Sequence, residues 1–283
     1  MLTKLFFLLF EIQTSLCSCQ PDIYRQGFHR AKPQYRIEKT GQMPAVANEN
    51  SGLATASAKP TFWTHNDSGG RPELYEIDAS GRLLTTWSLP QLTNKDWEEL
   101  SRDDRGHLYI GDIGNNTNTR QDLCIYQVSL SSDSSATLPK KITYHYEDQR
   151  AFPPERSRKN FDCEAFFYAQ DSLFLFSKNW GHKTATLYTI PAREGHHTAI
   201  RKDSIRLNGM ITAADISPDR QSFALLTYGK VFFFGIEHGQ INFKHPISCL
   251  KVGRGQIEGL VFISNTELLL TNEKGKIYKI SRR

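Results

Sequence analysis

Three glutamates occupy the same point in a short pattern that the chain repeats. Glu98, Glu164 and Glu258 each stand two residues before a large apolar residue. The same pattern places Ser51 and Ala214 at the matching points of two further repeats, so that successive positions are 47, 66, 50 and 44 residues apart. Carboxylates that meet at one point repel each other unless a cation or shared protons compensate. The pattern therefore predicts a cation-binding acidic site, provided that the fold brings the repeats together.

The available ligand atoms decide which cation such a site would prefer. The sequence has no CxxC or CxxH spacing, which argues against zinc and iron–sulfur clusters. Calcium accepts roughly six to eight oxygens and takes backbone carbonyls as well as carboxylates. We therefore predict Ca²⁺ on the channel axis with the ligands Ser51, Glu98, Glu164, Ala214 and Glu258. The alternative is a set of glutamates that pair with Lys or Arg and hold no metal.

A further pattern of polar residues recurs in several repeats. In each of these repeats it follows the second predicted strand. The runs WTHNDSGG, YIGDIGNN, FSKNWG and LTNEKG each end in polar residues followed by glycine. We expect these side chains at the mouth of a central channel, although tight turns also favour Asn, Asp and Gly. Asp67 and Asp112 are the candidate catalytic residues. The channel-mouth set is Asn66, Asp67, Asp112, Lys178, Asn179, Asn272 and Glu273.

Short strands must position these residues. The segment after Glu98 continues with HLYIGDIG, LCIYQV and KITYHYE, and the other repeats have similar runs bounded by turn residues. Such β-branched and aromatic runs predict strands, and four strands per repeat are the unit of a β-propeller. The sequence thus predicts an all-β protein, a propeller of five four-stranded blades. The longer second repeat leaves room for a sixth blade.

The last repeat contains only three predicted strands. The segment Tyr35–Lys39 (YRIEK) can supply the missing outer strand beside Lys276–Ile280. This pairing closes the ring and removes exposed sheet edges. We therefore expect a single propeller domain over residues 34–283.

The N-terminal residues resemble a processing signal. Lys4 precedes the apolar run LFFLLF, and LCSC at residues 16–19 resembles a bacterial lipobox. The apolar run is too short to span a bilayer. We expect residues 1–19 to be a signal peptide with a lipobox, Cys19 to be lipidated, and residues 20–33 to form a tether. This predicts an exported lipoprotein of the cell envelope, on the periplasmic or outer-membrane side. The alternative is a buried N-terminal strand of a cytoplasmic protein.

Cysteine count and charge limit the other functions. Without residues 17 and 19 the chain retains Cys124, Cys163 and Cys249, an odd number that argues against a disulfide framework. We interpret Cys163 as a buried strand residue rather than a nucleophile. A net charge of +5 with scattered Lys and Arg does not indicate nucleic-acid binding. The expected partner of a monomer is a small molecule or surface ligand, with membrane contact only through the lipid anchor.

The axial series resembles a known family. The runs SGL, WEEL, CEAF and IEGLVF, together with LYIGDIG at residues 108–114, are similar to the calcium-activated nucleotidase (apyrase) family. That resemblance implies five blades and an axial calcium, although Ala214 stands where the family pattern has serine. More loosely, the chain resembles the SMP-30/gluconolactonase and phytase-like propellers. Those proteins also hold calcium in the channel and usually have six blades.

Three classes of function remain open at this stage. One is a calcium-dependent hydrolase of phosphate or lactone-type esters that uses metal-activated water. The second is a surface binding module in which calcium is structural, and the third is a scaffold without metal. The sequence has no GxSxG motif, and His65 is the histidine nearest the expected site. We interpret His65 as a packing residue, so the enzyme hypothesis rests on the glutamates.

Overall fold

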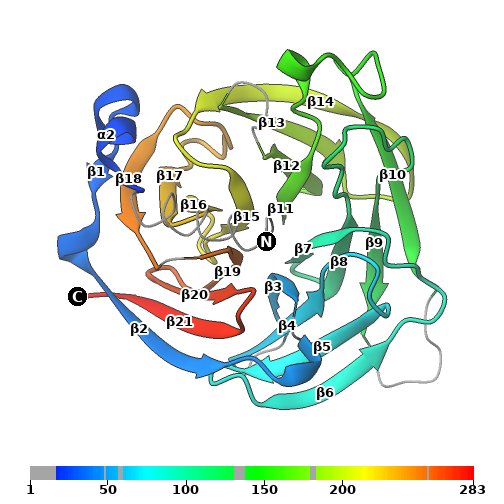
Figure 1. Ribbon diagram of the computed structural model, residues 1–283, viewed down its shortest axis with the longest axis horizontal. Helices are drawn as coiled ribbons and strands as arrows, with labels where there is room; N and C mark the ends of the chain where they lie inside the picture. Colours follow the sequence, from blue (N-terminus) through cyan, green and yellow to red (C-terminus); the bar gives the residue numbers. More distant parts are fainter. Residues whose placement is uncertain (1–16, 48, 57–59, 131–137, 179–182, 254) are drawn as a thin grey trace, which may run out of the picture.

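The protein is an all-β propeller whose sheets surround a central axis (Figure 1). The computed structural model describes residues 17–47, 49–56, 60–130, 138–178, 183–253 and 255–283. The innermost strands are β3, β7, β11, β15 and β19; each contacts the next, and β19 contacts β3. This arrangement places the starts of strands that are distant in sequence around one end of the axis.

The strands form four hydrogen-bonded sheets. One sheet has the order β3 (Asn50–Thr55), β4 (Thr61–Asn66), β5 (Glu73–Asp78), β6 (Leu83–Ser88). The eight-stranded sheet contains β7 (Trp97–Arg102), β8 (His107–Asp112), β9 (Cys124–Ser129), β10 (Lys140–Tyr146), β11 (Cys163–Ala169), β12 (Ser172–Ser177), β13 (Thr184–Pro191) and β14 (Gly195–Arg206). Its two halves, β7–β10 and β11–β14, are joined by the parallel pairing of β10 with β14.

The two remaining sheets hold both ends of the described chain. One contains β15 (Ile211–Ile216), β16 (Ser222–Thr227), β17 (Lys230–Gly235), β18 (Pro246–Lys251) and β1 (His29–Arg30). The other contains β19 (Ile257–Ser264), β20 (Glu267–Asn272), β21 (Lys276–Arg282) and β2 (Tyr35–Gln42). Helical segments are short: α2 (Gln20–Gln26), η1 (Lys32–Gln34), η2 (Ala45–Ala47) and η3 (Arg156–Arg158).

Burial follows the distance from the axis. Every residue of β11 is buried, whereas most residues of the outermost strand β6 are exposed. Inner strands are covered on both faces by neighbouring sheets, which explains their nearly continuous apolar sequences. Large aromatic side chains fill the space between sheets; Phe223, for example, stacks on Phe234 with ring centres 4.9 Å apart.

The predicted ring closure is confirmed by the register of β2. Tyr35 pairs with Arg282 and Lys39 pairs with Tyr278, in an antiparallel ladder between β2 and β21. The N-terminal part of the chain therefore completes the sheet that contains the C-terminal strands. Hydrogen bonding between the two ends satisfies backbone groups that would otherwise form an exposed edge.

Residues 20–33 are packed against the propeller, which differs from the predicted tether. Phe28 is buried between Phe232 and Phe234, with ring centres 5.1 and 5.2 Å away. The Lys230 ammonium group is fully buried, and Asp22 Oδ2 of α2 lies 2.7 Å from it. A buried ammonium needs a charged partner, so α2 is part of the folded domain.

A disulfide joins Cys19 to Cys249 and corrects two expectations about the cysteines. It shows that a disulfide is present despite the odd number of remaining cysteines. The same sulfur cannot also carry a thioether-linked lipid, so lipidation of Cys19 is incompatible with this structure. Cys163 is buried as predicted, and burial raises the pKa of its thiol.

Residues 1–16, which carry most of the predicted signal peptide, lie outside the described residues. Within the described part of the chain, no helix has the length and apolar composition needed to cross a bilayer.

We expect Cys249→Ala to lower the free energy of unfolding by about 2–4 kcal/mol, because a disulfide over a long loop restricts the unfolded chain. The bond spans 230 residues of sequence. Urea unfolding without reductant measures the effect, and wild type treated with reductant should match the variant. Identical unfolding curves for oxidised wild type and Cys249→Ala would contradict the structural role of this bond.

Candidate cation-binding site at one mouth of the channel

A β-bulge places each of the three repeated glutamates at the start of its inner strand. The pairing register shifts between Trp97 and Glu99, between Cys163 and Ala165, and between Ile257 and Gly259. The extra residues at these shifts are Glu98, Glu164 and Glu258. A bulge redirects the side chain of the extra residue, which explains why the repeats share this position.

The register also corrects one predicted ligand. In β15 the shift falls between Ile211 and Ala213, so the position equivalent to Glu98 is Thr212 rather than Ala214. The Thr212 hydroxyl donates to Ile257 O at 2.8 Å. In β3 the shift begins after Ser51, whose hydroxyl donates to Glu98 O at 2.7 Å. These two hydroxyls therefore link neighbouring inner strands around the mouth.

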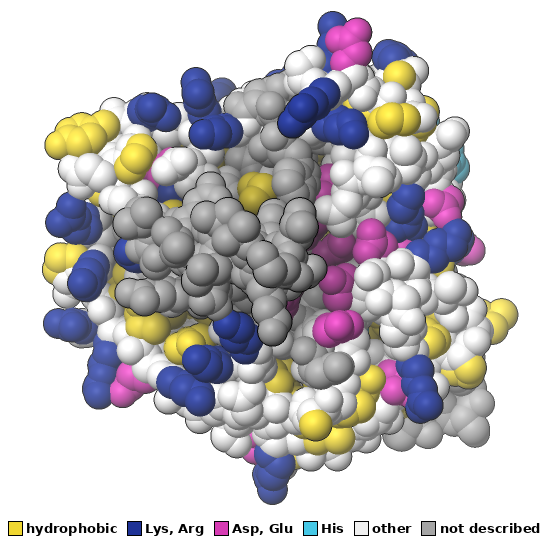
Figure 2. Space-filling model, in the orientation of Figure 1, with side chains coloured by type: hydrophobic (Ala, Val, Ile, Leu, Met, Phe, Trp, Pro, Cys, Tyr) yellow, Lys and Arg dark blue, Asp and Glu magenta, His cyan; other side chains and the backbone are white. Residues whose placement is uncertain are grey.

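Among the described residues, Asp67, Asp96 and Glu98 form a group of carboxylates that could hold a metal ion. One carboxylate oxygen of each lies within 4.8 Å of the others. Gly114 makes this approach possible, because a Cβ there would lie 2.2 Å from Glu98 Oε1 and 2.3 Å from Asp96 Oδ2. Figure 2 shows acidic side chains gathered beside the centre of the ring. Asp96 was not among the predicted site residues, although it begins the DWEEL run.

Burial and mutual repulsion raise the pKa values of these three carboxylates. Burial, followed by the charge of Asp67, raises the pKa of Asp96 to about 6. Burial also raises the pKa of Asp67. For Glu98, burial and then the charge of Glu164 raise the pKa well above its usual value. A cation at this position would relieve the same repulsion.

Lys178 brings a positive charge to the carboxylates of the mouth. Its Nζ lies 2.6 Å from Glu164 Oε1, and both side chains are buried. Burial raises the pKa of Glu164 to about 8, while Lys178 opposes that rise. Burial would lower the pKa of Lys178, but Glu164 and further anionic neighbours raise it overall. The predicted alternative of a glutamate paired with lysine thus holds for Glu164.

Glu258 and Glu273 extend the acidic mouth, and the charge of Asp67 acts on both of them. Tyr228 OH donates to Glu258 Oε1 at 3.3 Å, and Gln256 Nε2 donates to Glu273 Oε1. Burial, followed by the charge of Glu273, raises the pKa of Glu258 well above its usual value. Burial raises the pKa of Glu273 to about 6. Glu273 can therefore exchange a proton close to neutral pH.

Glu99 is a further axial carboxylate that the sequence pattern did not single out. It is fully buried and accepts backbone N–H bonds from Leu100 at 3.0 Å, Ala214 at 3.0 Å and Leu53 at 3.4 Å. These donors belong to three different inner strands. Ala214 therefore reaches the axis through its N–H group, which can donate a hydrogen bond to Glu99 but cannot bind a cation.

Asp112, a predicted catalytic residue, is buried and paired with Arg120. Arg120 Nη2 lies 2.8 Å from Asp112 Oδ1, and this buried carboxylate also accepts the N–H groups of Lys95 and Asp96 at 3.5 and 3.3 Å. Asp112 thereby holds the loop that carries Asp96.

The remaining predicted mouth residues mostly stabilise turns. Asn66 Nδ2 donates to Val46 O at 2.8 Å, and Asn272 Oδ1 accepts the N–H of Lys276 at 2.8 Å. Asn179 lies outside the described residues. His65 is fully buried with its ring edge-on to Trp97, and burial lowers its pKa to about 4. This agrees with the packing role expected for His65.

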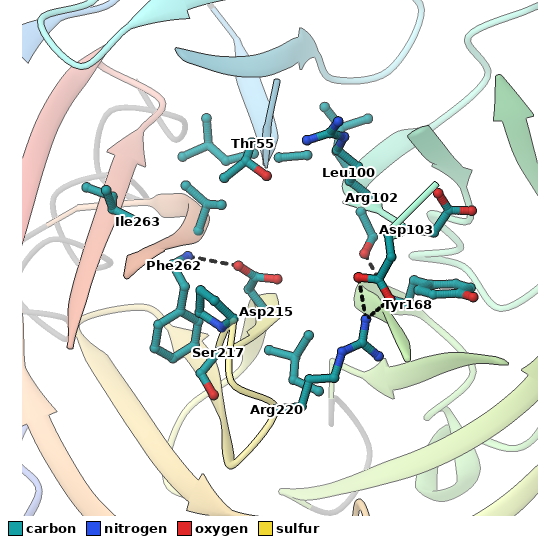
Figure 3. Close-up of a pocket in the computed structure, with 17 residues that line it drawn as sticks. Thr55, Leu100, Arg102, Asp103, Tyr168, Asp215, Ser217, Arg220, Phe262 and Ile263 are labelled. Atoms are coloured by element: carbon teal, nitrogen blue, oxygen red, sulfur yellow. Dashed lines mark hydrogen bonds and ion pairs between the residues drawn. The ribbon is translucent and has the colours of Figure 1, made fainter. Parts of the chain in front are cut away.

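The opposite end of the channel has a different character (Figure 3). A pocket of about 280 Å³ opens there, and the carboxylate of Asp215 points into it. Asp215 Oδ2 accepts the Phe262 N–H at 2.8 Å, and burial raises the Asp215 pKa to about 7. Arg220 and Asp104 form an ion pair at the rim, 2.6 Å apart. None of these residues belongs to the repeated glutamate pattern.

Comparisons with known proteins support the fold. No family model and no curated protein matches this chain. The PQQ-bound aldose sugar dehydrogenase from Streptomyces coelicolor is 8% identical, with a TM-score of 0.55 over 88% of this chain and 99% of that chain. A protein assigned provisionally as a gluconolactonase is 8% identical, with a TM-score of 0.50 over 88% of this chain and 92% of that chain. At this identity the likeness shows the β-propeller fold alone.

We expect stability without metal to fall as pH rises from about 5 to 8. The pKa values of Asp96 and Glu273 are raised to about 6 and that of Glu164 to about 8. In this range the folded protein holds more protons than the unfolded chain, so a rise in pH favours unfolding. Urea midpoints in chelator at constant ionic strength measure the trend, and Asp96→Asn should make it shallower. A midpoint that rises throughout this range would contradict the prediction.

We expect Lys178→Met to lower the free energy of unfolding by about 3–5 kcal/mol, because it leaves Glu164 buried without its cationic partner. The double variant Lys178→Met/Glu164→Gln should recover part of the loss, since no buried charge remains unpaired at that pair. Urea denaturation of the four proteins gives the coupling energy. Additive losses in the double variant would show that the ion pair is not coupled.

Proposed function

We propose that Asp67, Asp96 and Glu98 bind a divalent cation, preferably Ca²⁺, in a hydrolase that acts on lactone-type or phosphate esters. The observation that carries this proposal is the approach of three carboxylates to within 4.8 Å of one another. Their chemistry fits a hard cation, because all three donors are carboxylate oxygens. Burial and then the charge of neighbouring carboxylates raise the pKa of Asp96 and Glu98, and a bound cation would relieve that repulsion.

This proposal moves the cation away from the axial set predicted by the repeats. Of those five residues only Glu98 belongs to the close group, while Glu164 already faces the Lys178 ammonium. Ca²⁺ is preferred over Mg²⁺ because it accepts flexible coordination by carboxylates and backbone carbonyls, whereas Mg²⁺ requires nearly ideal octahedral geometry.

A bound divalent cation would supply polarisation of an ester oxygen and a more acidic water. The side chains would perform the other tasks. Lys178 places a positive charge at the mouth, where it can stabilise negative charge on a substrate. Glu273, with a pKa raised to about 6 by burial, is one mouth carboxylate that can take up and release a proton near neutral pH.

We also propose that the propeller has five blades. The eight-stranded sheet divides into β7–β10 and β11–β14, which are antiparallel within themselves and meet through the parallel pair β10 and β14. Treating these halves as separate blades gives every blade four principal strands.

We further propose that the protein is exported and acts as a monomer on a small molecule. The Cys19–Cys249 bond supports export, because disulfides persist in oxidising compartments. With its sulfur in the bond to Cys249, Cys19 has no thiol to carry a lipid.

A binding module is the second candidate function. The Lys178–Glu164 ion pair favours it, because an ammonium group supplies part of the positive charge that a metal would otherwise provide. In this case the mouth would recognise a ligand without catalysing a reaction, and the cation would be structural or absent.

Calcium binding and hydrolysis can be tested together. Calorimetry and thermal unfolding would be measured with Ca²⁺, Mg²⁺ or chelator for wild type, Glu98→Gln and Asp96→Asn. A hundredfold excess of Ca²⁺ over its dissociation constant should stabilise wild type by about 2.7 kcal/mol, and both variants should lose most of that gain. The exposed residue Glu38 pairs with Arg36 on β2, so Glu38→Gln is a matched control that should respond like wild type.

Hydrolysis of sugar lactones and nucleoside diphosphates should require Ca²⁺ and fail in Glu98→Gln. Ion binding without hydrolysis of either class would favour the binding module. Equal responses of wild type and Glu98→Gln to Ca²⁺ would rule out the proposed ion site.

A further inference from the structure

A second candidate ligand site lies between the β3–β6 sheet and the neighbouring strands β8 and β9. This inter-sheet cleft has a volume of about 610 Å³, and its lining includes Trp63, Glu76, Thr85, Trp87, Arg102 and Ser129. It opens away from the acidic mouth, because Arg102 ends β7 whereas Glu98 stands near the start of that strand. Small-molecule sites commonly have volumes of roughly 300–1,000 Å³.

The strand register builds one wall of the inter-sheet cleft. Trp63 pairs with Glu76, and Glu76 pairs with Thr85, so the three side chains form a row across β4, β5 and β6. Trp87 stands two residues after Thr85 and therefore projects from the same face. This wall presents aromatic surface beside a carboxylate and a hydroxyl group.

The opposite wall adds small and polar groups. His107 pairs with Ser129 between β8 and β9, and Gly106 and Leu108 flank His107 along the chain. Gly106 has a positive φ of 87°, which a glycine adopts easily. The turn before β8 thus passes close to the cleft without a side chain that would fill it.

Arg102 is the most informative residue of the inter-sheet cleft. It lines both this cleft and the channel pocket of Figure 3. Its side chain is partly buried, and among the described residues no ion pair or hydrogen bond to its guanidinium group is found. Arg105 adds a second positive charge; its nearest carboxylate, Asp171, is 3.9 Å away. A partly buried guanidinium without a counter-ion favours an anionic ligand.

We propose that the inter-sheet cleft binds a saccharide ring that carries a carboxylate. Indole faces such as those of Trp63 and Trp87 pack against the apolar C–H face of a sugar. Glu76, Thr85 and Ser129 offer partners for its hydroxyl groups, and Arg102 pairs with its carboxylate. A neutral sugar would leave Arg102 unpaired, and a flat aromatic anion would leave the hydroxyl partners unused.

This site is independent of the proposed cation site, and the experiment separates the two. Oligosaccharides of glucuronate or galacturonate, and their neutral glucose and galactose counterparts, would be titrated in chelator, with calorimetry and tryptophan fluorescence as readouts. We expect saturable binding of the acidic saccharides that is at least about tenfold tighter than that of the neutral ones, the order expected for one charge-assisted pair.

Variants assign the contacts. Trp87→Ala should weaken binding of acidic saccharides by about tenfold or more, as expected for loss of an aromatic anchor. Arg102→Gln should abolish the preference for acidic over neutral saccharides. Trp87→Phe should retain most of the affinity, and Arg36→Gln, an exposed arginine on β2, should bind like wild type. Thermal unfolding confirms that each variant is folded.

Three results would overturn the proposal. One is the absence of saturable binding to any acidic saccharide by folded wild type. Another is acidic-saccharide binding that is unchanged in both Trp87→Ala and Arg102→Gln. The third is binding that is lost in Glu98→Gln but kept in Trp87→Ala, which would place the saccharide at the acidic mouth.

Discussion

The crowding of carboxylates at one mouth of the channel is the constraint on which the rest of the site depends. Carboxylates close together in a buried place cannot all carry a charge without compensation. The protein supplies several kinds of compensation. Lys178 pairs with Glu164, and Tyr228 donates to Glu258. Gly114 leaves room for the oxygens of Asp96 and Glu98. What remains is an excess of negative charge, which protons or a cation must balance.

The propeller creates this crowding through its geometry. Each inner strand begins at the mouth, and a bulge at the start of β7, β11 and β19 redirects one glutamate there. Hydroxyl groups at the equivalent positions of β3 and β15 donate to the backbone of the next inner strand. Deeper in the channel, Glu99 accepts hydrogen bonds from three inner strands. The same carboxylates that repel each other therefore also connect the ring.

The ring depends on the N-terminal segment as well as on the repeats. β2 completes the sheet of the C-terminal strands, and β1 extends the sheet of β15–β18. Asp22 neutralises the buried Lys230, and the Cys19–Cys249 bond fixes the start of α2 to β18.

The two ends of the channel remain chemically distinct. One is dominated by carboxylates, whereas the other combines Asp215 with Arg102 and Arg220.

The sequence by itself determined the repeat, the strands and the closing role of residues 35–39. These features depend on local patterns and on the need to pair a free sheet edge, and both can be seen in the order of residues. The sequence also identified Glu98, Glu164 and Glu258, because a repeated carboxylate in a strand requires a shared cause.

Tertiary structure decided the details of the site. Thr212, two residues before Ala214, is the equivalent residue because strand pairing places the bulge there, which apolar spacing does not reveal. Asp96 and Glu99 became site residues only through the fold, which places Gly114 beside Asp96 and brings the N–H groups of Ala214 and Leu53 from other inner strands to Glu99. The partners of Lys178 and Cys19 likewise depend on the fold, since charge and sulfur pairing follow distance in space rather than in sequence.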